Sequence, residues 1–239
     1  MALATLAPAL PARERLAVLE EASQLLSRAG NDRQLAVAYQ NVANVALHEG
    51  RAHEALHLLG VALRATEKLA TPAPKMLVLG SLGMANLFAG NFAKARAAFQ
   101  EQLRLCAGRQ FRYGADEGLA GLAALMMADG HPENGALLLG AARAMGYPGS
   151  GDLPIFERLE RDYYSPGRAR CTPSAWRHAE HQGTTLSYED AIAGALTEAP
   201  RPTSNSPVLA DANAVPDRFA QRLDGALERT LTSPHPHNT

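Results

Sequence analysis

The sequence has only two cysteines, Cys106 and Cys171, in 239 residues, which is too few for a disulfide framework. This scarcity is typical of a reducing compartment, and we expect a cytoplasmic protein. Basic and acidic residues nearly balance, 23 against 24, so we expect no direct contact with nucleic acid. The longest apolar run, from Leu119 to Ala128, is about half the length of a membrane span. We therefore expect no membrane insertion, and no secretory signal because no basic residue precedes the first apolar stretch.

Motifs for metal or phosphate binding are also scarce. The phosphate-binding pattern GxxxxGK followed by serine or threonine does not occur, and no helix-turn-helix stands outside the repeats described below. His53 and His57 lie four residues apart, a spacing that can place two metal ligands on one helix face. Neither this pair nor His178 with His181 has the third ligand that a metal site requires. The sequence therefore predicts solvated histidines and no metal site.

Catalytic residues are not apparent either. Cys106 and Cys171 have no neighbouring base that would activate a nucleophile, so we expect buried or incidental thiols. Asp162, Tyr163 and Tyr164 could serve acid–base chemistry, but the end of an amphipathic helix explains them more simply. We therefore expect neither a cofactor nor a catalytic centre.

A repeat of forty residues dominates the first two thirds of the sequence. Gly50, Gly90 and Gly130 recur at this interval, each after a strongly apolar stretch. Large apolar residues stand eight positions before and nine positions after each glycine, and small residues stand seven before and five after. The large positions hold Val42, Leu82, Leu122, Leu59, Phe99 and Leu139, and the small ones hold Ala43, Gly83, Ala123, Ala55, Ala95 and Gly135. This pattern predicts a pair of antiparallel helices in each repeat, with the glycine ending the first helix in left-handed backbone.

These small and large positions resemble the tetratricopeptide repeat, which places them at the same offsets around the turn between its helices. Tyr39, Ala43 and Leu59 fit the first unit, Gly83 and Phe99 fit the second, and the third unit is weaker. The resemblance implies an all-α fold, a right-handed α-solenoid of about three long helix pairs with helical caps. Helices this long are similar to the C-terminal sensor region of LuxR-type and antibiotic-regulatory transcription activators of bacteria.

The remaining segments suggest caps and a tail around this solenoid. We expect an N-terminal capping helix in 1–30, three repeats in 31–150, a C-terminal helical cap in 151–196, a linker in 197–216, and a terminal amphipathic helix and tail in 217–239. The cap contains LPIFERLERDYY and Ala175-Trp176, which resemble the segment that closes the activator solenoids. It departs from that pattern at Pro166, Gly167 and Pro173, which should interrupt an otherwise continuous helix. The narrow apolar stripe of the terminal helix must dock on this chain, on a second copy or on a partner.

The resemblance also implies that the first helix of each pair lines a concave surface. The candidate binding residues on this surface are Gln40, Asn44, Leu47, His48, Met84, Leu87, Phe88 and Met127. Most are apolar, with Gln40, Asn44 and His48 as a polar cluster at one end. A bare apolar trough usually marks a binding site. The alternative is that the trough is closed by its own helices, or is filled by residues 217–231, which would make these side chains core.

Two functions follow from this trough. The first is a non-catalytic interaction or regulatory module that binds a protein or peptide, similar to the sensor part of a transcription activator. The second is a receptor for a hydrophobic small molecule, or a recruited enzyme, that uses the same trough. A self-associating scaffold, and hence a homodimer, is a third possibility that would depend on the terminal helix.

Overall fold

The computed structural model describes residues 12–107, 114–148 and 154–197. The chain divides into two units, Met1–Pro202 and Thr203–Thr239, and all described residues belong to the first. The predicted helix at 217–231 and most of the linker at 197–216 therefore lie outside the described residues. Throughout the described residues the regular structure is helical, and no strand occurs there.

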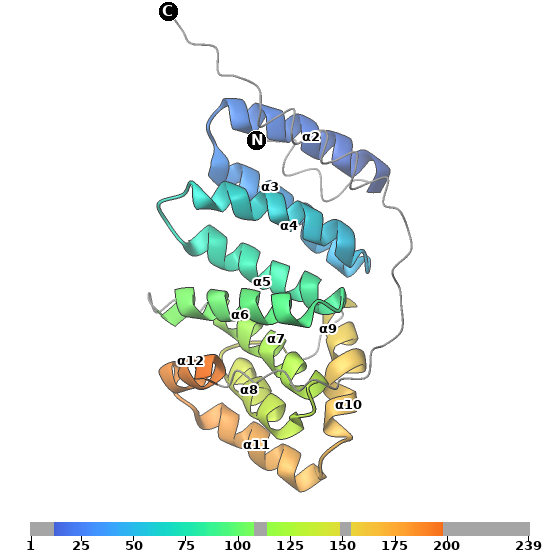
Figure 1. The fold of residues 1–239 in the computed structure, drawn as a ribbon, viewed down its shortest axis with the longest axis vertical. Coiled ribbons are helices and arrows are strands. Elements are labelled where there is room, and N and C mark those ends of the chain that lie inside the picture. The colour runs from blue at the N-terminus through green and yellow to red at the C-terminus, as the bar shows by residue number, and fades with distance from the viewer. Residues whose placement is uncertain (1–11, 108–113, 149–153, 198–239) are drawn as a thin grey trace, which may run out of the picture. The chain divides into compact units, whose positions relative to one another are not determined.

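The helices follow one another with short connections (Figure 1). They are α2 (Ala12–Arg28), α3 (Asp32–His48), α4 (Ala52–Glu67), α5 (Ala73–Phe88), α6 (Phe92–Ala107), α7 (Ala115–Ala128), α8 (Pro132–Ala144), α9 (Pro154–Leu159), the π-helical turn η2 (Glu160–Tyr164), α10 (Ser165–Arg168), α11 (Pro173–Thr185) and α12 (Tyr188–Thr197). From α2 to α8 each helix packs against the next one. In addition, α3 packs against α5, and α5 against α7.

The repeated glycines stand at the turns where the sequence predicts them. Gly50, Gly90 and Gly130 have φ of 77°, 78° and 87°, in the left-handed region that favours glycine. Each donates its N–H to a carbonyl three residues earlier, that of Leu47, Leu87 or Met127, which ends α3, α5 and α7. These turns connect α3 to α4, α5 to α6 and α7 to α8, and the helices of each pair pack together.

Small residues allow neighbouring helices to approach closely. Ala43, Ala55 and Ala95 are fully buried, as their positions in the repeat predict. A buried aromatic ring fills the space that two glycines leave: Phe99 of α6 lies against Gly83 of α5 and Gly121 of α7, where any β-carbon would overlap the ring. The core therefore depends on a large side chain fitted to glycine surfaces.

The interruption predicted at Pro166 and Gly167 lies further along the chain. The backbone stays helical through both residues and leaves the helix only after Arg168, before Pro173 starts α11. The π-helical turn accommodates this, because the N–H of Ser165 bonds to the Glu160 carbonyl five residues earlier and Pro166 follows in the first turn of α10. Proline is tolerated there since it removes no hydrogen bond that a first turn needs.

Candidate functional site

The eight candidate binding residues lie on α3, α5 and α7, the first helices of the three pairs. The five apolar ones, Leu47, Met84, Leu87, Phe88 and Met127, are all buried. Buried side chains cannot form an open trough. Another part of the described chain must therefore cover these five side chains.

The cover is the helical segment 154–168, formed by α9, η2 and α10, which we call the cover helix. Its first part packs against α3, its π-helical turn against α7, and its last part against α7 and α8. Figure 1 shows this segment running beside the ends of the stacked helices. It belongs to the predicted C-terminal cap, whereas the occupants of the trough expected from the sequence were the helices themselves or residues 217–231.

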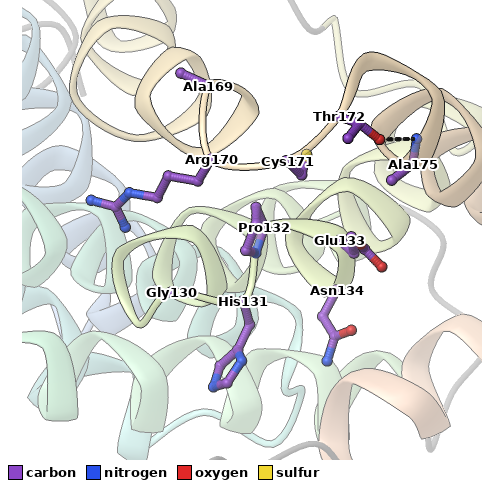
Figure 2. A pocket seen from close by; sticks show the side chains of 10 residues that line it. All are labelled: Gly130, His131, Pro132, Glu133, Asn134, Ala169, Arg170, Cys171, Thr172 and Ala175. Carbon is purple, nitrogen blue, oxygen red and sulfur yellow. Dashed lines mark hydrogen bonds between the residues drawn. The ribbon is translucent and has the colours of Figure 1, made fainter.

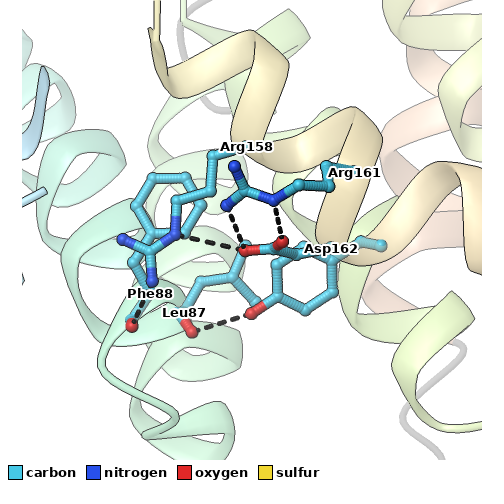
Figure 3. Close-up of polar contacts among 6 residues, drawn as sticks. Leu87, Phe88, Arg158, Arg161 and Asp162 are labelled. Atoms are coloured by element: carbon cyan, nitrogen blue, oxygen red, sulfur yellow. Dashed lines mark hydrogen bonds and ion pairs between the residues drawn. The ribbon is translucent and has the colours of Figure 1, made fainter.

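Two side chains of the cover helix bind the C-terminal end of α5 (Figure 3). The Arg158 guanidinium lies 4.3 Å from the centre of the Phe88 ring, and its Nη2 donates a hydrogen bond of 3.0 Å to the Phe88 carbonyl. The Tyr163 hydroxyl donates one of 3.0 Å to the Leu87 carbonyl. A cation at a helix C-terminus is favoured by the helix dipole, and over an aromatic face by the ring quadrupole. The C-terminal end of α5 is therefore a binding site for an arginine side chain and a tyrosine side chain.

Asp162 orients the arginine of this contact. Its Oδ2 lies 3.3 Å from Arg158 Nε, while Arg161 approaches the same carboxylate from the solvent side, with Nε 2.7 Å from Oδ1. The hydrogen bond from Arg161 and the charges of Arg161 and Arg158 lower the pKa of Asp162, although partial burial opposes this. Arg161 is 70% exposed and forms hydrogen bonds with both oxygens of the Asp162 carboxylate.

The cover helix makes a second set of contacts with α7. Tyr164 is fully buried and its hydroxyl donates a 3.0 Å hydrogen bond to the Ala120 carbonyl. Gly167 lies so close to Met127 that a β-carbon would stand 2.7 Å from Met127 Cγ. Arg170, just after the cover helix, donates a 3.1 Å hydrogen bond to the Met127 carbonyl. Leu87 and Met127 are equivalent in the forty-residue pattern, so side chains from 163 and 170 bind the same backbone position in two successive repeats.

The predicted polar cluster on α3 does not act as one unit. Gln40 donates a 3.3 Å hydrogen bond to Ser81 and so joins α3 to α5. Asn44 is partly exposed. His48 occupies the position equivalent to Phe88, and its buried Nδ1 has no hydrogen-bond partner among the described residues. Burial lowers the pKa of His48, which favours the neutral ring at pH 7.

Two pockets also occur in the described part of the chain. One of about 610 Å³ lies between the start of α8 and residues 169–175 (Figure 2). Its polar side chains do not converge, since Arg170 and His131 point in different directions in Figure 2, and a small-molecule site normally needs a few convergent polar groups. The other, of about 540 Å³, is an apolar groove on α4, α5 and α6 lined in part by Leu82. Leu82 is partly exposed there, although its repeat equivalents Val42 and Leu122 are fully buried.

One partly buried carboxyl lies near the start of α7. Glu117 of α7 fits against Gly80 of α5 and accepts a 3.3 Å hydrogen bond from Gln102 of α6. Burial raises the pKa of Glu117 to about 7, the Gln102 hydrogen bond lowers it, and Asp116 raises it further. The carboxyl of Glu117 is therefore partly protonated at neutral pH.

This raised pKa predicts a pH-dependent stability. The unfolded chain releases the Glu117 proton near its ordinary pKa of about 4.3, before the folded chain does, so stability is fully present below that pH and is lost as pH rises through about 7. We expect the free energy of unfolding to fall by on the order of 1–2 kcal/mol between pH 5 and 8 through this group, allowing for solvent screening. Urea unfolding should show a flatter pH dependence for Glu117→Gln, and an unaltered one for exposed Glu133→Gln. Equal slopes for Glu117→Gln and the wild type would contradict the assignment.

The thiols and histidines offer no further chemistry within the described residues. Cys106 is buried with its Sγ 3.3 Å from Met76 Sδ, and burial raises the pKa of the thiol to about 11. Cys171 is a partly exposed free cysteine that forms no disulfide. Over the part of the chain that the structure describes, no group of three or more His, Cys, Asp or Glu side chains could hold a metal. No described helix has the length and apolar character to cross a bilayer.

Sequence reasoning missed the residues that make the contact from the cover side. Tyr163 and Tyr164 were expected at the end of an amphipathic helix, with acid–base chemistry as the alternative, and no role was expected for Arg158 and Arg170. The available signal was three large side chains, Leu159, Tyr163 and Tyr164, within a segment rich in charge. No protein-family model, no curated protein and no solved structure matches the chain, so the assignment rests on the geometry described above.

Proposed function

We propose that the chain is a non-catalytic interaction module, a right-handed tetratricopeptide-like solenoid of about three helix pairs that binds a helical protein segment across the ends of α3, α5 and α7. This role is similar to that of the sensor region of bacterial LuxR-type and antibiotic-regulatory activators. One observation carries the proposal: the buried face that holds Leu87, Phe88 and Met127 is already in contact with a helix.

The contact has the features of helix recognition. Apolar side chains provide buried area, while backbone carbonyls at successive helix ends accept hydrogen bonds from Tyr163, Arg158 and Arg170. A carbonyl oxygen has two lone pairs, so the carbonyls of Leu87 and Met127 can accept a side-chain donor from this side in addition to the N–H of Gly90 or Gly130. Laying an amphipathic helix into such a groove is a recurring mode of peptide binding.

A peptide titration tests this function. A synthetic peptide with the sequence of residues 154–170 should bind a chain carrying Arg158→Ala and Tyr163→Phe, whose own cover helix has lost its contacts with the end of α5. Fluorescence anisotropy should show saturable binding at one peptide per chain. The same peptide with both substitutions should bind at least tenfold more weakly, because it lacks the arginine and hydroxyl donors.

Two results would contradict the proposal. One is no binding of the wild-type peptide to a variant that circular dichroism shows to be folded. The other is a small hydrophobic compound, found by native mass spectrometry on protein purified from its source, that displaces the peptide, which would favour the receptor function instead.

A further inference from the structure

The cover helix lies on the surface formed by the ends of α3, α5 and α7, which we call the groove. It contacts this groove through two pairs of side chains with the same spacing. Arg158 and Tyr163 both bind the end of α5, and Leu159 and Tyr164 are both fully buried. The members of each pair are five residues apart. In a regular α-helix residues four apart share a face, whereas residues five apart diverge by about 140° at 3.6 residues per turn.

The π-helical turn explains this spacing. It spans Glu160–Tyr164, so it begins after the first member of each pair and includes the second, and the Ser165 N–H bonds to the Glu160 carbonyl at its end. A π-helical turn inserts one residue into an α-helix and so brings positions five apart onto one face. The cover helix therefore meets the groove only by adopting an uncommon helical turn, whose hydrogen bonds are poorer than those of an α-helix.

A regular α-helix would meet the same groove without this turn. It would need an arginine followed four residues later by a tyrosine, with an apolar residue after the arginine and a second aromatic residue after the tyrosine. Such a helix could make the Phe88 and Leu87 contacts of the cover helix and fill the positions of Leu159 and Tyr164. A ligand shifts a conformational equilibrium by its differential affinity for the two states, and this helix has such a difference because it binds only a vacated groove.

The backbone of the cover helix also approaches its neighbours less closely than that of α11 does, because Gly167 lies against the Met127 side chain rather than against backbone. The cover helix binds α5 and α7 largely through side chains that donate to backbone carbonyls. The following α11 is locked to α8 by contrast, because Gly140 and Gly183 bring the two backbones together and Arg143 pairs with Glu180. Segments with fewer buried contacts open at a lower free energy than the rest of a protein.

We propose that the cover helix is a displaceable latch, and that the partner of this chain is an α-helix carrying arginine and tyrosine four residues apart, which replaces the latch at the end of α5. This inference rests on the proposed function and names its partner. In the closed protein the latch keeps Phe88, Leu87 and Met127 from solvent. Binding of the partner exposes the latch instead, including Leu159 and Tyr164.

Three peptides test the register. The first has the sequence of residues 154–170, and the second is the same sequence without Arg161, which places arginine and tyrosine four apart. The third is the second with alanine and phenylalanine in place of that arginine and tyrosine. On the wild-type chain, fluorescence anisotropy should show the second peptide binding at least tenfold more tightly than the other two. Equal binding of the first and second peptides would overturn the register.

Chain variants and hydrogen exchange test displacement. The chain with Arg158→Ala and Tyr163→Phe should bind the second peptide at least tenfold more tightly than the wild type. A chain with Glu157→Ala, at an exposed position of the same segment, should bind it as the wild type does. Saturating peptide should accelerate amide exchange in 154–168 and leave α5 and α7 protected. Equal affinity of the wild type and the double variant, or binding without faster exchange in 154–168, would overturn the latch while leaving helix binding intact. Failure of every peptide to bind the folded double variant would instead overturn the proposed function, and the latch with it.

Discussion

Replacing Phe99 with alanine should lower the free energy of unfolding by about 3–5 kcal/mol, the largest effect we expect from a single truncation. The Phe99 side chain is fully buried between Gly83 and Gly121, and neither glycine has a side chain that could move into the space left by the ring. Neighbouring side chains therefore cannot fill the space, and a cavity remains. The change is measured by urea unfolding followed by circular dichroism.

Phe92 on the same helix provides the matched control. It is 39% exposed, and its ring packs edge-on against Tyr163 with centroids 6.5 Å apart. Phe92→Ala should cost about 1 kcal/mol, as expected for a partly exposed aromatic pair. If the two alanine variants unfold at the same urea concentration, Phe99 does not have the central position that the packing gives it.

Gly183→Ala should destabilise the protein by about 3 kcal/mol or detach α11 from α8. A β-carbon at this position would overlap the Leu137 carbonyl oxygen and stand 2.9 Å from the Ala141 nitrogen, so the backbone of one helix must move. Side-chain rearrangement cannot relieve such an overlap. Differential scanning calorimetry should show either a lower Tm or a second transition for the detached segment.

Two other helical glycines give the opposite expectation. Gly60 in α4 has only the end of Arg64 near its β-carbon position, at 3.8 Å, and Gly194 in α12 has nothing within 4 Å. Alanine is the better helix former, so Gly60→Ala and Gly194→Ala should each stabilise the protein by up to about 1 kcal/mol. A stabilising Gly183→Ala would show that α8 and α11 do not cross where the structure places them.

The sequence predicted the helices and their turns because the signals involved are local. A glycine after an apolar helical stretch ends the helix by its own backbone preference, as Gly50, Gly90 and Gly130 do. Small residues such as Ala55 and Ala95 mark helix crossings regardless of what lies beyond them. These features repeat at a fixed interval, so each copy supported the interpretation of the others.

The occupant of the trough could not be predicted in the same way. Arg158 and Tyr163 bind carbonyls 70 and 76 residues away, and backbone carbonyls are present at every position of a sequence. Periodicity showed that Leu87, Phe88 and Met127 share a face, but an apolar face can meet a ligand or a helix of its own chain. The π-helical turn further hid the contact, because it replaces the four-residue spacing by which a buried helix face is recognised.

The partial exposure of Leu82 could not be predicted either, because it also depends on how separate helices meet. The repeat predicts a buried residue at this position, and Val42 and Leu122 are fully buried. The groove at Leu82 arises from how α4, α5 and α6 meet, with Leu56 and Ala98 on its other sides. A repeat pattern specifies the spacing within a helix pair and leaves such differences between pairs undetermined.

Amide hydrogen exchange of the protein alone tests most directly whether residues 154–168 are docked in a groove that can hold a helix. A helix of this length is marginal in isolation, so protection of its amides reports docking rather than helix propensity. We expect amide exchange in 154–168 to be much slower than in an unfolded chain, yet faster than in α5 and α7. Exchange at the unfolded rate would contradict docking, and exchange as slow as that of α7 would contradict a segment that a partner can displace.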